Sequence, residues 1–472
     1  MTKKVLCSYC GTGCQLEYNE IAKKLSGKEY CLKGVRQTEI INKNRTDKIL
    51  FRRNKNTKFQ EKDWNFIYKF ITDKIKNTDP KKIAIYSSGQ IQTEDYYIIN
   101  KLFKGFIGTN NVDSNSRTCV ASAAVGLSKS IGVDYVPGTK EDVLKTDLIL
   151  IIGANPAKAH PVFFDNYIKK AKKLGKKIVV IDPRYSKTAE IADLYIDILP
   201  GQDIELFNSI SAYIYKHNLY DRNFIDKYIE NKEEFFNFLE KWNIEKGIKN
   251  AGITKKQFDK LIEMIIQNKK MVSIWAMGIN QSYNGVNKNL SIMNLHLLLG
   301  RIFEEGNNPF PETGQPNAMG GREVGGLSHL LAVGYSFLNK DIYNFNIAKE
   351  KIAKFWNTDI NKIPDEQGLT AVEIFEEALY KNKFGGIDIL FVVHTDLVYH
   401  LPNRNMIEKA IKNIPLVIEI NAYKNSETSK FSNIILPASP WGEKQGHMTS
   451  MDRIVGKNNS IKEINKISNQ TG

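Results

Sequence analysis

The sequence predicts an α/β fold: interleaved, doubly wound domains with mostly parallel sheets, behind a small N-terminal domain. Three observations predict it. Short β-branched, apolar runs alternate along the chain with stretches of helical period, which is the pattern of βαβ winding. Polar loops that contain glycine follow several of these runs. Four of the five cysteines lie within the first 31 residues, outside this alternation.

Each predicted strand is an apolar run that ends in a polar segment. Strands are expected at Lys82–Ser87, Asp147–Ile152, Lys177–Ile181, Tyr195–Leu199, Val272–Met277, Asp388–Val393 and Leu416–Ile420. Helices are expected over Glu94–Phe106 and Val162–Leu174, where apolar residues recur with helical period. Because parallel strands need crossover connections of this kind, the alternation predicts parallel sheets.

Residues 306–335 break the alternation. The stretch is rich in Gly, Pro and Asn, so we expect neither helix nor strand there. A long loop of this kind inside a compact domain is usually functional or disordered, and the embedded Arg322 and Glu323 favour a functional role.

The length of 472 residues allows several domains. We expect a cysteine-bearing domain over residues 1–50 and a dinucleotide-binding α/β domain over 139–305. A second α/β domain is expected to be interleaved with it, built from residues 51–138 and 306–460.

The net charge of +15 could mark a surface for nucleic acid or for an acidic partner. Lysine is spread along the whole chain, and no basic stripe is interleaved with aromatic residues, so we expect no nucleic-acid partner. No apolar run is long enough to span a bilayer, and no secretory signal core is recognisable, so we expect a cytoplasmic protein. A basic surface would speed the docking of an acidic electron carrier.

The N-terminal cysteines have the spacing of a metal site. They are Cys7, Cys10, Cys14 and Cys31. A 4Fe-4S cluster needs four converging thiolates, and Gly11 and Gly13 would let backbone amides approach its sulfurs. Structural zinc is the alternative, but zinc sites usually pair two short cysteine knuckles and Cys31 has no close cysteine neighbour. An odd number of cysteines and the lack of a secretory signal argue against disulfides.

Three successive strand ends carry residues suited to a nucleotide. The residues are Gly153 and Asn155, Asp182 and Arg184, and Gly201 and Asp203. Backbone amides can cradle a pyrophosphate, while carboxylates accept hydrogen bonds from ribose or base donors. Each loop by itself is more often an ordinary turn, but three such loops at successive strand ends favour a dinucleotide site.

Cys119 stands alone in the segment NSRTCVASAAVG. The neighbouring Arg117 could lower the pKa of its thiol and favour the thiolate. A buried apolar cysteine is the ordinary alternative, and a nucleophile would need a histidine base that the sequence does not indicate. A soft thiolate ligand to a transition metal is the third possibility.

Seven segments together carry a family resemblance. They are CSYCGTGC with CLKG, SSGQIQTEDYY, NSRTCVAS, GANPAKAHP, DPR, TGQPNAMGGREVGG and ILPASPWGEKQGHMTS. They resemble the molybdopterin oxidoreductases, and most closely the assimilatory nitrate reductases. The resemblance implies a molybdenum bis(molybdopterin guanine dinucleotide) cofactor and a 4Fe-4S cluster in the N-terminal domain. It also implies reduction of nitrate to nitrite by oxygen-atom transfer, with electrons entering through the cluster.

The resemblance also implies roles for individual residues. Cys119 would be the protein thiolate on molybdenum, and Lys33, in CLKG, would be a buried ammonium between cluster and pterin. Arg322, with Glu323 beside it, would lie near the substrate funnel and orient nitrate, although a structural salt bridge is the alternative for Arg322. The dinucleotide arms would be held by Gly153, Asn155, Asp182, Arg184, Gly201, Asp203, Gly278 and Gln315.

The sequence departs from the family pattern in several places. The gap from Cys14 to Cys31 is short, Val120 stands where nitrate reductases commonly carry Met, and HTDLVYHLP stands where an Asn-Pro pair is usual. Family members continue into a β-rich C-terminal domain, which we expect to be absent here. Without its contacts we expect weak or absent activity from these 472 residues.

Two other functions compete with nitrate reduction. A formate dehydrogenase would share nearly all the motifs, but there histidine typically follows the ligating residue, where this chain has Val120. A non-enzymatic, zinc-stapled basic binding module is disfavoured by the doubly wound pattern. The expected electron donor is ferredoxin, flavodoxin or a nicotinamide-linked reductase subunit.

Overall fold

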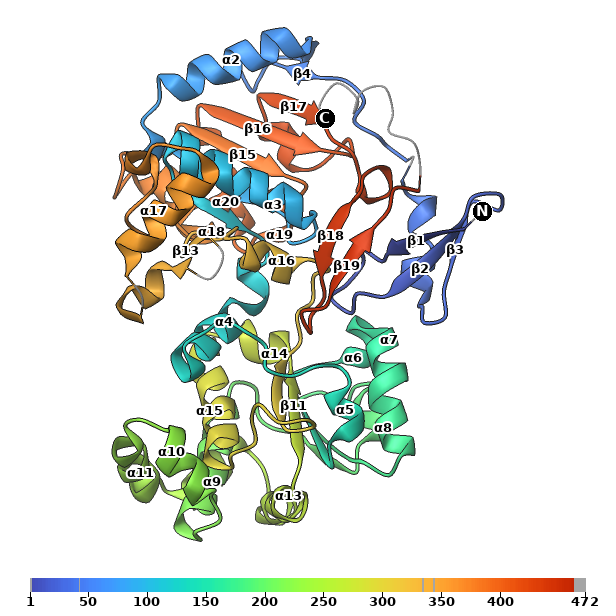
Figure 1. Ribbon diagram of the computed structural model, residues 1–472, viewed down its shortest axis with the longest axis vertical. Helices are drawn as coiled ribbons and strands as arrows, with labels where there is room; N and C mark the ends of the chain where they lie inside the picture. Colours follow the sequence, from blue (N-terminus) through green and yellow to red (C-terminus); the bar gives the residue numbers. More distant parts are fainter. Residues whose placement is uncertain (1, 42, 333–334, 343, 462–472) are drawn as a thin grey trace.

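Two helix-covered parallel sheets and a small antiparallel sheet make up the computed structural model (Figure 1). It describes residues 2–461 apart from 42, 333–334 and 343. Among the described residues, no helix combines the length and apolarity needed to cross a membrane. The predicted α/β class with mostly parallel sheets is confirmed.

The N-terminal domain is a three-stranded antiparallel sheet followed by one short helix. Its elements are β1 (Thr2–Leu6), β2 (Gln15–Asn19), β3 (Lys24–Ser26) and α1 (Leu32–Val35). Val5, Leu16 and Leu25 are buried between the sheet and α1. This small core holds the β1–β2 loop, with its three cysteines, beside Cys31 at the start of α1.

The first large sheet has seven strands in the order β5-β4-β17-β16-β15-β6-β7. The parallel members are β6 (Ile83–Ser87), β7 (Val112–Ser114), β15 (Ile389–Val393), β16 (Leu416–Asn421) and β17 (Ile434–Pro437). The edge strands β4 (Leu50–Phe51) and β5 (Gln60–Glu61) run antiparallel. Chain order reverses between β6 and β15, so loops diverge there and open a crevice.

Helices cover both faces of this seven-strand lobe. One face packs against α18 (Ala371–Tyr380) and α20 (Arg404–Asn413). The other packs against α2 (Trp64–Lys76) and the π-helical segment Lys101–Ile107, which continues α3 (Thr93–Asn100). Side chains alternate between the faces along β15, where Leu390 and Val392 lie in one core and Phe391 in the other.

The second sheet has five parallel strands in the order β10-β9-β8-β11-β12. They are β8 (Leu148–Ile152), β9 (Lys177–Ile181), β10 (Leu194–Ile196), β11 (Met271–Trp275) and β12 (Asn308–Pro311). Chain order reverses between β8 and β11, and in open α/β sheets such a switch point is where ligands bind. On one face lie α9 (Asp203–Lys216), α13 (Lys255–Gln267) and α15 (Gly285–Leu298); the helical stretch from α7 (Pro161–Phe163) to α8 (Lys169–Lys173) covers the other.

The structure corrects the expectation of an irregular loop over residues 306–335. This stretch holds β12, α16 (Ala318–Glu323) and β13 (Leu330–Ala332). β12 tolerates its prolines because it is an edge strand, and its pairing with β11 carries this lobe past the expected boundary at residue 305. In α16, packing overrides helix propensity: a Cβ on Gly321 would lie 2.8 Å from the Tyr96 ring.

The C-terminal hairpin returns to the N-terminal domain (Figure 1). Its strands are β18 (Gly446–Thr449) and β19 (Val455–Asn458). Asn458 Oδ1 accepts a hydrogen bond from the Leu6 amide at 3.2 Å, and Trp441 Nε1 donates to the Leu6 carbonyl at 2.7 Å. The β18–β19 turn therefore lies against the cysteine loop.

Candidate metal and cofactor site

The cysteine loop is ordered by its own backbone and by two glycines. The Cys7 amide donates to the Cys14 carbonyl at 2.9 Å, and Gln37 Nε2 lies 2.9 Å from Cys7 Sγ. A Cβ on Gly11 would lie 2.0 Å from the Thr313 carbonyl oxygen, and one on Gly13 would lie 2.6 Å from Ser450 Cβ. Both glycines are thus needed where the loop packs against other segments.

The four N-terminal thiols lie close enough to disfavour one another's ionisation. Burial raises the pKa of Cys7 to about 12, and the charges of Cys10 and Cys31 add to the shift. Burial also raises the pKa of Cys14, as does each of the other three cysteines. Within the described residues, no three His, Cys, Asp or Glu side chains are grouped to hold one metal ion. A four-iron cluster is wider than one ion, and its positive irons would relieve this repulsion.

Cys119 lies in the first turn of α4 (Arg117–Ile131), directly before a kink at Val120, where the backbone leaves helical geometry with φ −121° and ψ 15°. Burial raises the pKa of Cys119, while the Gly314 backbone and the charge of Arg322 lower it. The expectation for Arg117 is wrong, because its guanidinium pairs with Asp113 at 3.0 Å and donates to His329 Nδ1 at 3.0 Å. Arg322 is the cation that acts on Cys119.

The backbone of residues 312–315 joins the cysteine loop to Cys119. The Gly11 amide donates to the Gly314 carbonyl at 2.9 Å, and the Gly314 backbone also contacts the Cys119 thiol. The two cysteine sites are therefore neighbours in space although they are distant in sequence.

A buried ion pair stands at this junction. His160 Nδ1 lies 2.5 Å from Glu312 Oε1, at angles that do not meet hydrogen-bond geometry. Burial lowers the pKa of His160 and is the largest single influence, but Glu312 and the backbone of Thr313 and Gly314 together outweigh it, so the net shift is upward. Glu312 also raises the pKa of both Cys10 and Cys119, so its charge acts on both cysteine sites. Sequence reasoning missed this pair, which no local pattern connects.

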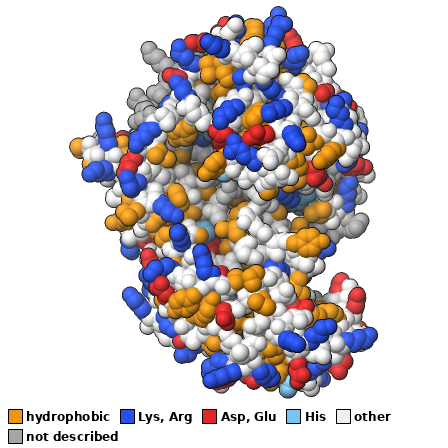
Figure 2. All heavy atoms as spheres, turned by 180° about the vertical axis from the view of Figure 1, so that it is seen from behind, with side chains coloured by type: hydrophobic (Ala, Val, Ile, Leu, Met, Phe, Trp, Pro, Cys, Tyr) orange, Lys and Arg blue, Asp and Glu red, His pale blue; other side chains and the backbone are white. Residues whose placement is uncertain are grey.

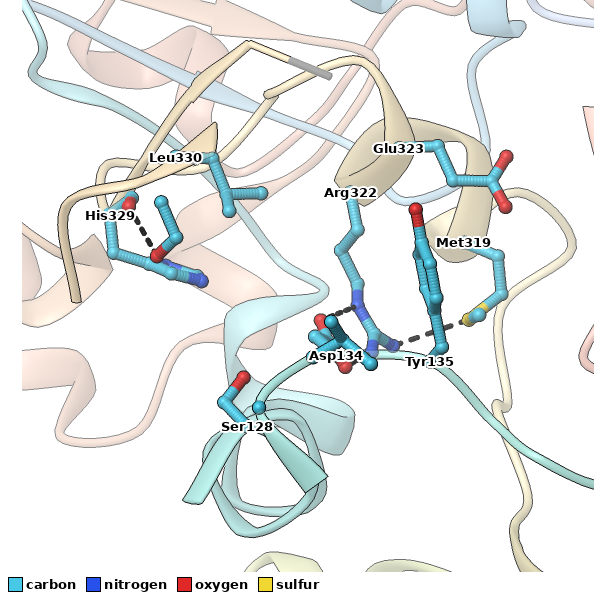
Figure 3. A pocket seen from close by; sticks show the side chains of 11 residues that line it. Ser128, Asp134, Tyr135, Met319, Arg322, Glu323, His329 and Leu330 are labelled. Atoms are coloured by element: carbon cyan, nitrogen blue, oxygen red, sulfur yellow. Dashed lines mark hydrogen bonds and ion pairs between the residues drawn. The ribbon is translucent and has the colours of Figure 1, made fainter. Parts of the chain in front are cut away.

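Arg322 borders a cavity of about 90 Å³ (Figure 3). Its Nε donates to Asp134 Oδ2 at 2.7 Å, Nη2 donates to the other carboxylate oxygen, and Nη1 lies 3.3 Å from Met319 Sδ. The ion pair is thus made with the segment after α4. Glu323 lines the same cavity but points away from Arg322, accepting from Arg453 Nε at 3.2 Å.

Gly153 and Gly278 meet at the switch point between β8 and β11. Gly153 has φ +53°, and the Gly278 amide donates to its carbonyl at 3.0 Å. A Cβ on Gly278 would lie 2.7 Å from Gly153 Cα, so glycine is required for this approach. Two strand-end loops are thereby held together, with Gly278 exposed.

The other strand-end residues share the same edge of the sheet. Burial raises the pKa of Asp182, and the charge of Asp203 raises it further, so the two carboxylates are close. Asp203 Oδ2 forms an ion pair with Nζ of the buried Lys288 at 2.5 Å. The sequence did not indicate this partner. Asn155 Oδ1 accepts from Thr188 at 2.8 Å, while Arg184 and Gly201 are exposed.

Gln315 and Lys33 have opposite environments. Gln315 Nε2 donates to Asn115 at 2.8 Å, but its Oε1 is buried with no hydrogen-bond partner, which marks an acceptor available to a ligand. Lys33 is exposed; its ammonium lies 3.4 Å from the Lys158 carbonyl and over the Tyr9 ring. The expectation of a buried ammonium at Lys33 is therefore wrong.

A larger cavity of about 390 Å³ lies at the switch point of the seven-strand lobe. Its lining includes Ser88, Gln92, His394, Asn421 and Trp441, from loops that follow β6, β15, β16 and β17. Tyr9 of the cysteine loop borders it as well. The seven-strand sheet thus has a ligand-sized cavity at its carboxyl edge, and Cys119 lies in α4, on the connection between the lobes.

Comparison with known proteins gives a consistent result. The family model "Molybdopterin oxidoreductase" matches residues 45–465. A nitrate reductase of Synechocystis sp. is 36% identical over 96% of the chain, which spans 65% of that relative's length. The F420-dependent formate dehydrogenase 1 subunit alpha of Methanococcus maripaludis is 29% identical, with 99% of the chain and 67% of the relative covered. The structure of acetylene hydratase from Pelobacter acetylenicus shares the fold, with a TM-score of 0.79 at 18% identity, covering 98% of this chain and 66% of that one.

Proposed function

Because the chain belongs to the molybdopterin oxidoreductase family, we propose that it acts in a molybdenum-dependent nitrate reductase whose electrons enter through an N-terminal 4Fe-4S cluster. The observation that carries the proposal is the junction at Gly314, whose backbone touches both the Cys119 thiol and the cysteine loop. Two thiolate sites bridged by one peptide suit electron transfer between two inorganic centres. Similarity to nitrate reductases supports nitrate as the substrate.

The chain's own residues fit the cofactor that the family implies. Cys119 would provide the thiolate ligand, and the unsatisfied Gln315 Oε1 would accept a hydrogen bond from the cofactor. For the guanine dinucleotide form, the Gly153–Gly278 contact leaves room for phosphates at the switch point, and Asp182 would accept from the base or ribose. The second arm would occupy the crevice beside His394.

The residues around the small cavity would orient nitrate. When bound, the cofactor supplies two electrons and takes up the oxygen atom that nitrate loses. Asp134 holds Nε and Nη2 of Arg322, and Nη1 faces the weak acceptor Met319 Sδ at 3.3 Å, so a planar oxyanion would replace Met319 at the outer edge formed by Nη1 and Nη2. Burial and the charge of Arg117 hold the pKa of His329 well below its usual range, so this wall of the cavity is neutral.

An acidic electron carrier, either ferredoxin or flavodoxin, or a nicotinamide-linked reductase subunit, would deliver the electrons. On the face in Figure 2, Lys and Arg side chains are spread over both lobes with acidic side chains among them. The net charge of +15 would attract an acidic carrier over a distance. A cytoplasmic, assimilatory role is part of the proposal, because thiols stay reduced there.

Metal analysis and two assays test the proposal. Holoprotein purified without oxygen should contain iron, sulfide and molybdenum, and should form nitrite from nitrate with reduced viologen at the low rate expected of these 472 residues. Protein that contains a single zinc and no molybdenum would contradict it.

Formate oxidation is the second candidate, because a formate dehydrogenase subunit is similar over 99% of the chain. Val120 argues against it, since its buried apolar side chain cannot move a proton next to Cys119. Formate-dependent reduction of a dye without nitrate reduction would reverse this preference. Family membership contradicts the zinc-stapled, non-enzymatic module.

A further inference from the structure

Lys140 places a buried ammonium against the cysteine loop. The residue is 7% exposed and lies on the segment that leads from α4 into the five-strand lobe. Its Nζ donates to the Thr12 carbonyl at 3.0 Å and to Asp452 Oδ1 at 2.8 Å. Thr12 stands between Cys10 and Cys14, so the positive charge reaches the loop directly.

Asp452 holds the Lys140 ammonium in place through their ion pair. It lies in the β18–β19 turn, accepts from Ser450 Oγ, and its second carboxylate oxygen lies 3.4 Å from the Lys140 amide nitrogen. The same turn is fastened to the loop, because the Met451 amide donates to the Gly11 carbonyl at 2.7 Å. Three segments distant in sequence thus meet at one buried ion pair beside the cysteines.

The Lys140 ammonium is buried between the cysteine loop and the β18–β19 turn, with Thr12 on one side and Asp452 on the other. A buried ammonium is costly to desolvate, so its retention here calls for a partner and favours a functional reason. The exposed Lys33 is screened by water and acts more weakly at the same distance.

We infer that Lys140, held by Asp452, is a positioning residue that fixes the cysteine loop and raises the reduction potential of the cluster. Reduction adds one electron to the cluster, and a fixed positive charge at Thr12 favours the state with more negative charge. The inference rests on the proposed 4Fe-4S cluster and adds to it the residue pair that sets its potential.

Redox titration of the cluster in holoprotein, followed by electron paramagnetic resonance, tests the inference. Lys140→Met should lower the ratio of reduced to oxidised cluster about tenfold at a fixed solution potential, which is 59 mV for one electron. Lys140→Arg should stay close to the wild type. Asp452→Asn should shift the ratio the other way, because it leaves the ammonium unpaired. Lys33→Met is the matched control and should shift the ratio less than Lys140→Met.

An electrostatic role predicts that Lys140→Met and Asp452→Asn shift the ratio of reduced to oxidised cluster in opposite directions. A role in supporting the loop alone does not predict opposite shifts. Shifts of the same sign, or a larger shift from Lys33→Met, would overturn the inference. Iron content is measured for each variant. If Lys140→Met loses iron, two results decide: Asp452→Asn should raise the ratio of reduced to oxidised cluster, and Lys140→Arg should keep it close to the wild-type value. Wild-type protein without an iron–sulfur signal would instead refute the cluster itself.

Discussion

Burial raises the pKa of the Cys119 thiol, and the charge of Glu312 adds to that shift. The backbone of Gly314 and Gln315 and the charge of Arg322 offset part of the rise. The isolation of Cys119 in the sequence left three interpretations open. Contact with the 312–315 segment favours the metal ligand over the inert buried thiol.

Replacing Cys119 should affect the proposed molybdenum site and leave the proposed iron–sulfur cluster intact. Cys119→Ala should lower nitrate reduction by more than about 100-fold, since even outer-shell changes at metal sites cost 10–100-fold. Iron content should stay at the wild-type level. Cys31→Ala is the matched variant and should lose iron instead. Equal loss of iron in both would contradict separate sites.

The Arg322 guanidinium makes a structural ion pair, and we propose that it also orients nitrate. Asp134 takes one edge of the guanidinium, while Nη1 on the other edge lies beside Met319 Sδ at the cavity wall (Figure 3). Arg322→Lys should lower kcat/KM for nitrate by about 10- to 100-fold, because a charge-assisted hydrogen bond contributes about 1.5–3 kcal/mol. Steady-state kinetics with reduced viologen measures this, and unchanged kcat/KM would remove Arg322 from nitrate binding.

The helix α15 is tied to β11 through a buried histidine. His296 Nε2 lies 2.7 Å from Ser273 Oγ, and Nδ1 lies 2.7 Å from the Arg301 carbonyl. Burial lowers the pKa of His296 to about 4. The link matters for the site because β11 leads directly into Gly278 at the switch point.

Stability of the five-strand lobe should therefore depend on pH. Between the usual histidine pKa and about 4, His296 is protonated in the unfolded chain but neutral in the folded chain. The free energy of unfolding therefore falls as the pH falls through this range. The loss due to His296 should approach about 3 kcal/mol by pH 4. Thermal unfolding of wild type and His296→Gln from pH 7 to pH 4 measures it, and parallel curves would contradict the assignment.

The whole molecule is closed by contacts between its two ends. Leu6 bonds to both Trp441 and Asn458, and the β18–β19 turn supports the cysteine loop (Figure 1). A domain this small buries little apolar surface of its own, so the contacts with the hairpin should add to its stability.

A chain that ends at Glu443 should consequently fail to retain the cluster. It lacks β18, β19 and Asp452, so the loop loses the hydrogen bond from Met451 and the partner of Lys140. Iron per chain should fall to background in this variant. A chain that ends at Ile461 keeps the hairpin and should bind iron as the full chain does. Normal iron in the shorter chain would contradict the role of the hairpin.

Much of the architecture could be predicted because strands and turns depend on residues that are close together in the sequence. The expected strands at Lys82–Ser87, Asp147–Ile152 and Lys177–Ile181 are present within a residue at either end, since apolar runs and glycine turns act over a few residues. The family resemblance is confirmed as well. By contrast, α16 could not be predicted, because its glycines are selected by packing on Tyr96 and not by helix propensity.

The sequence by itself determined the order of strands and helices, the candidate thiol ligands and the family, because these depend on residue type and short spacing. Only the tertiary structure decided which groups meet: Arg322 with Asp134, Glu312 with His160, and Lys140 with Asp452 beside the cysteine loop. Such pairs join residues more than a hundred positions apart. Their energies come from burial and close approach, which leave no periodic trace along the chain.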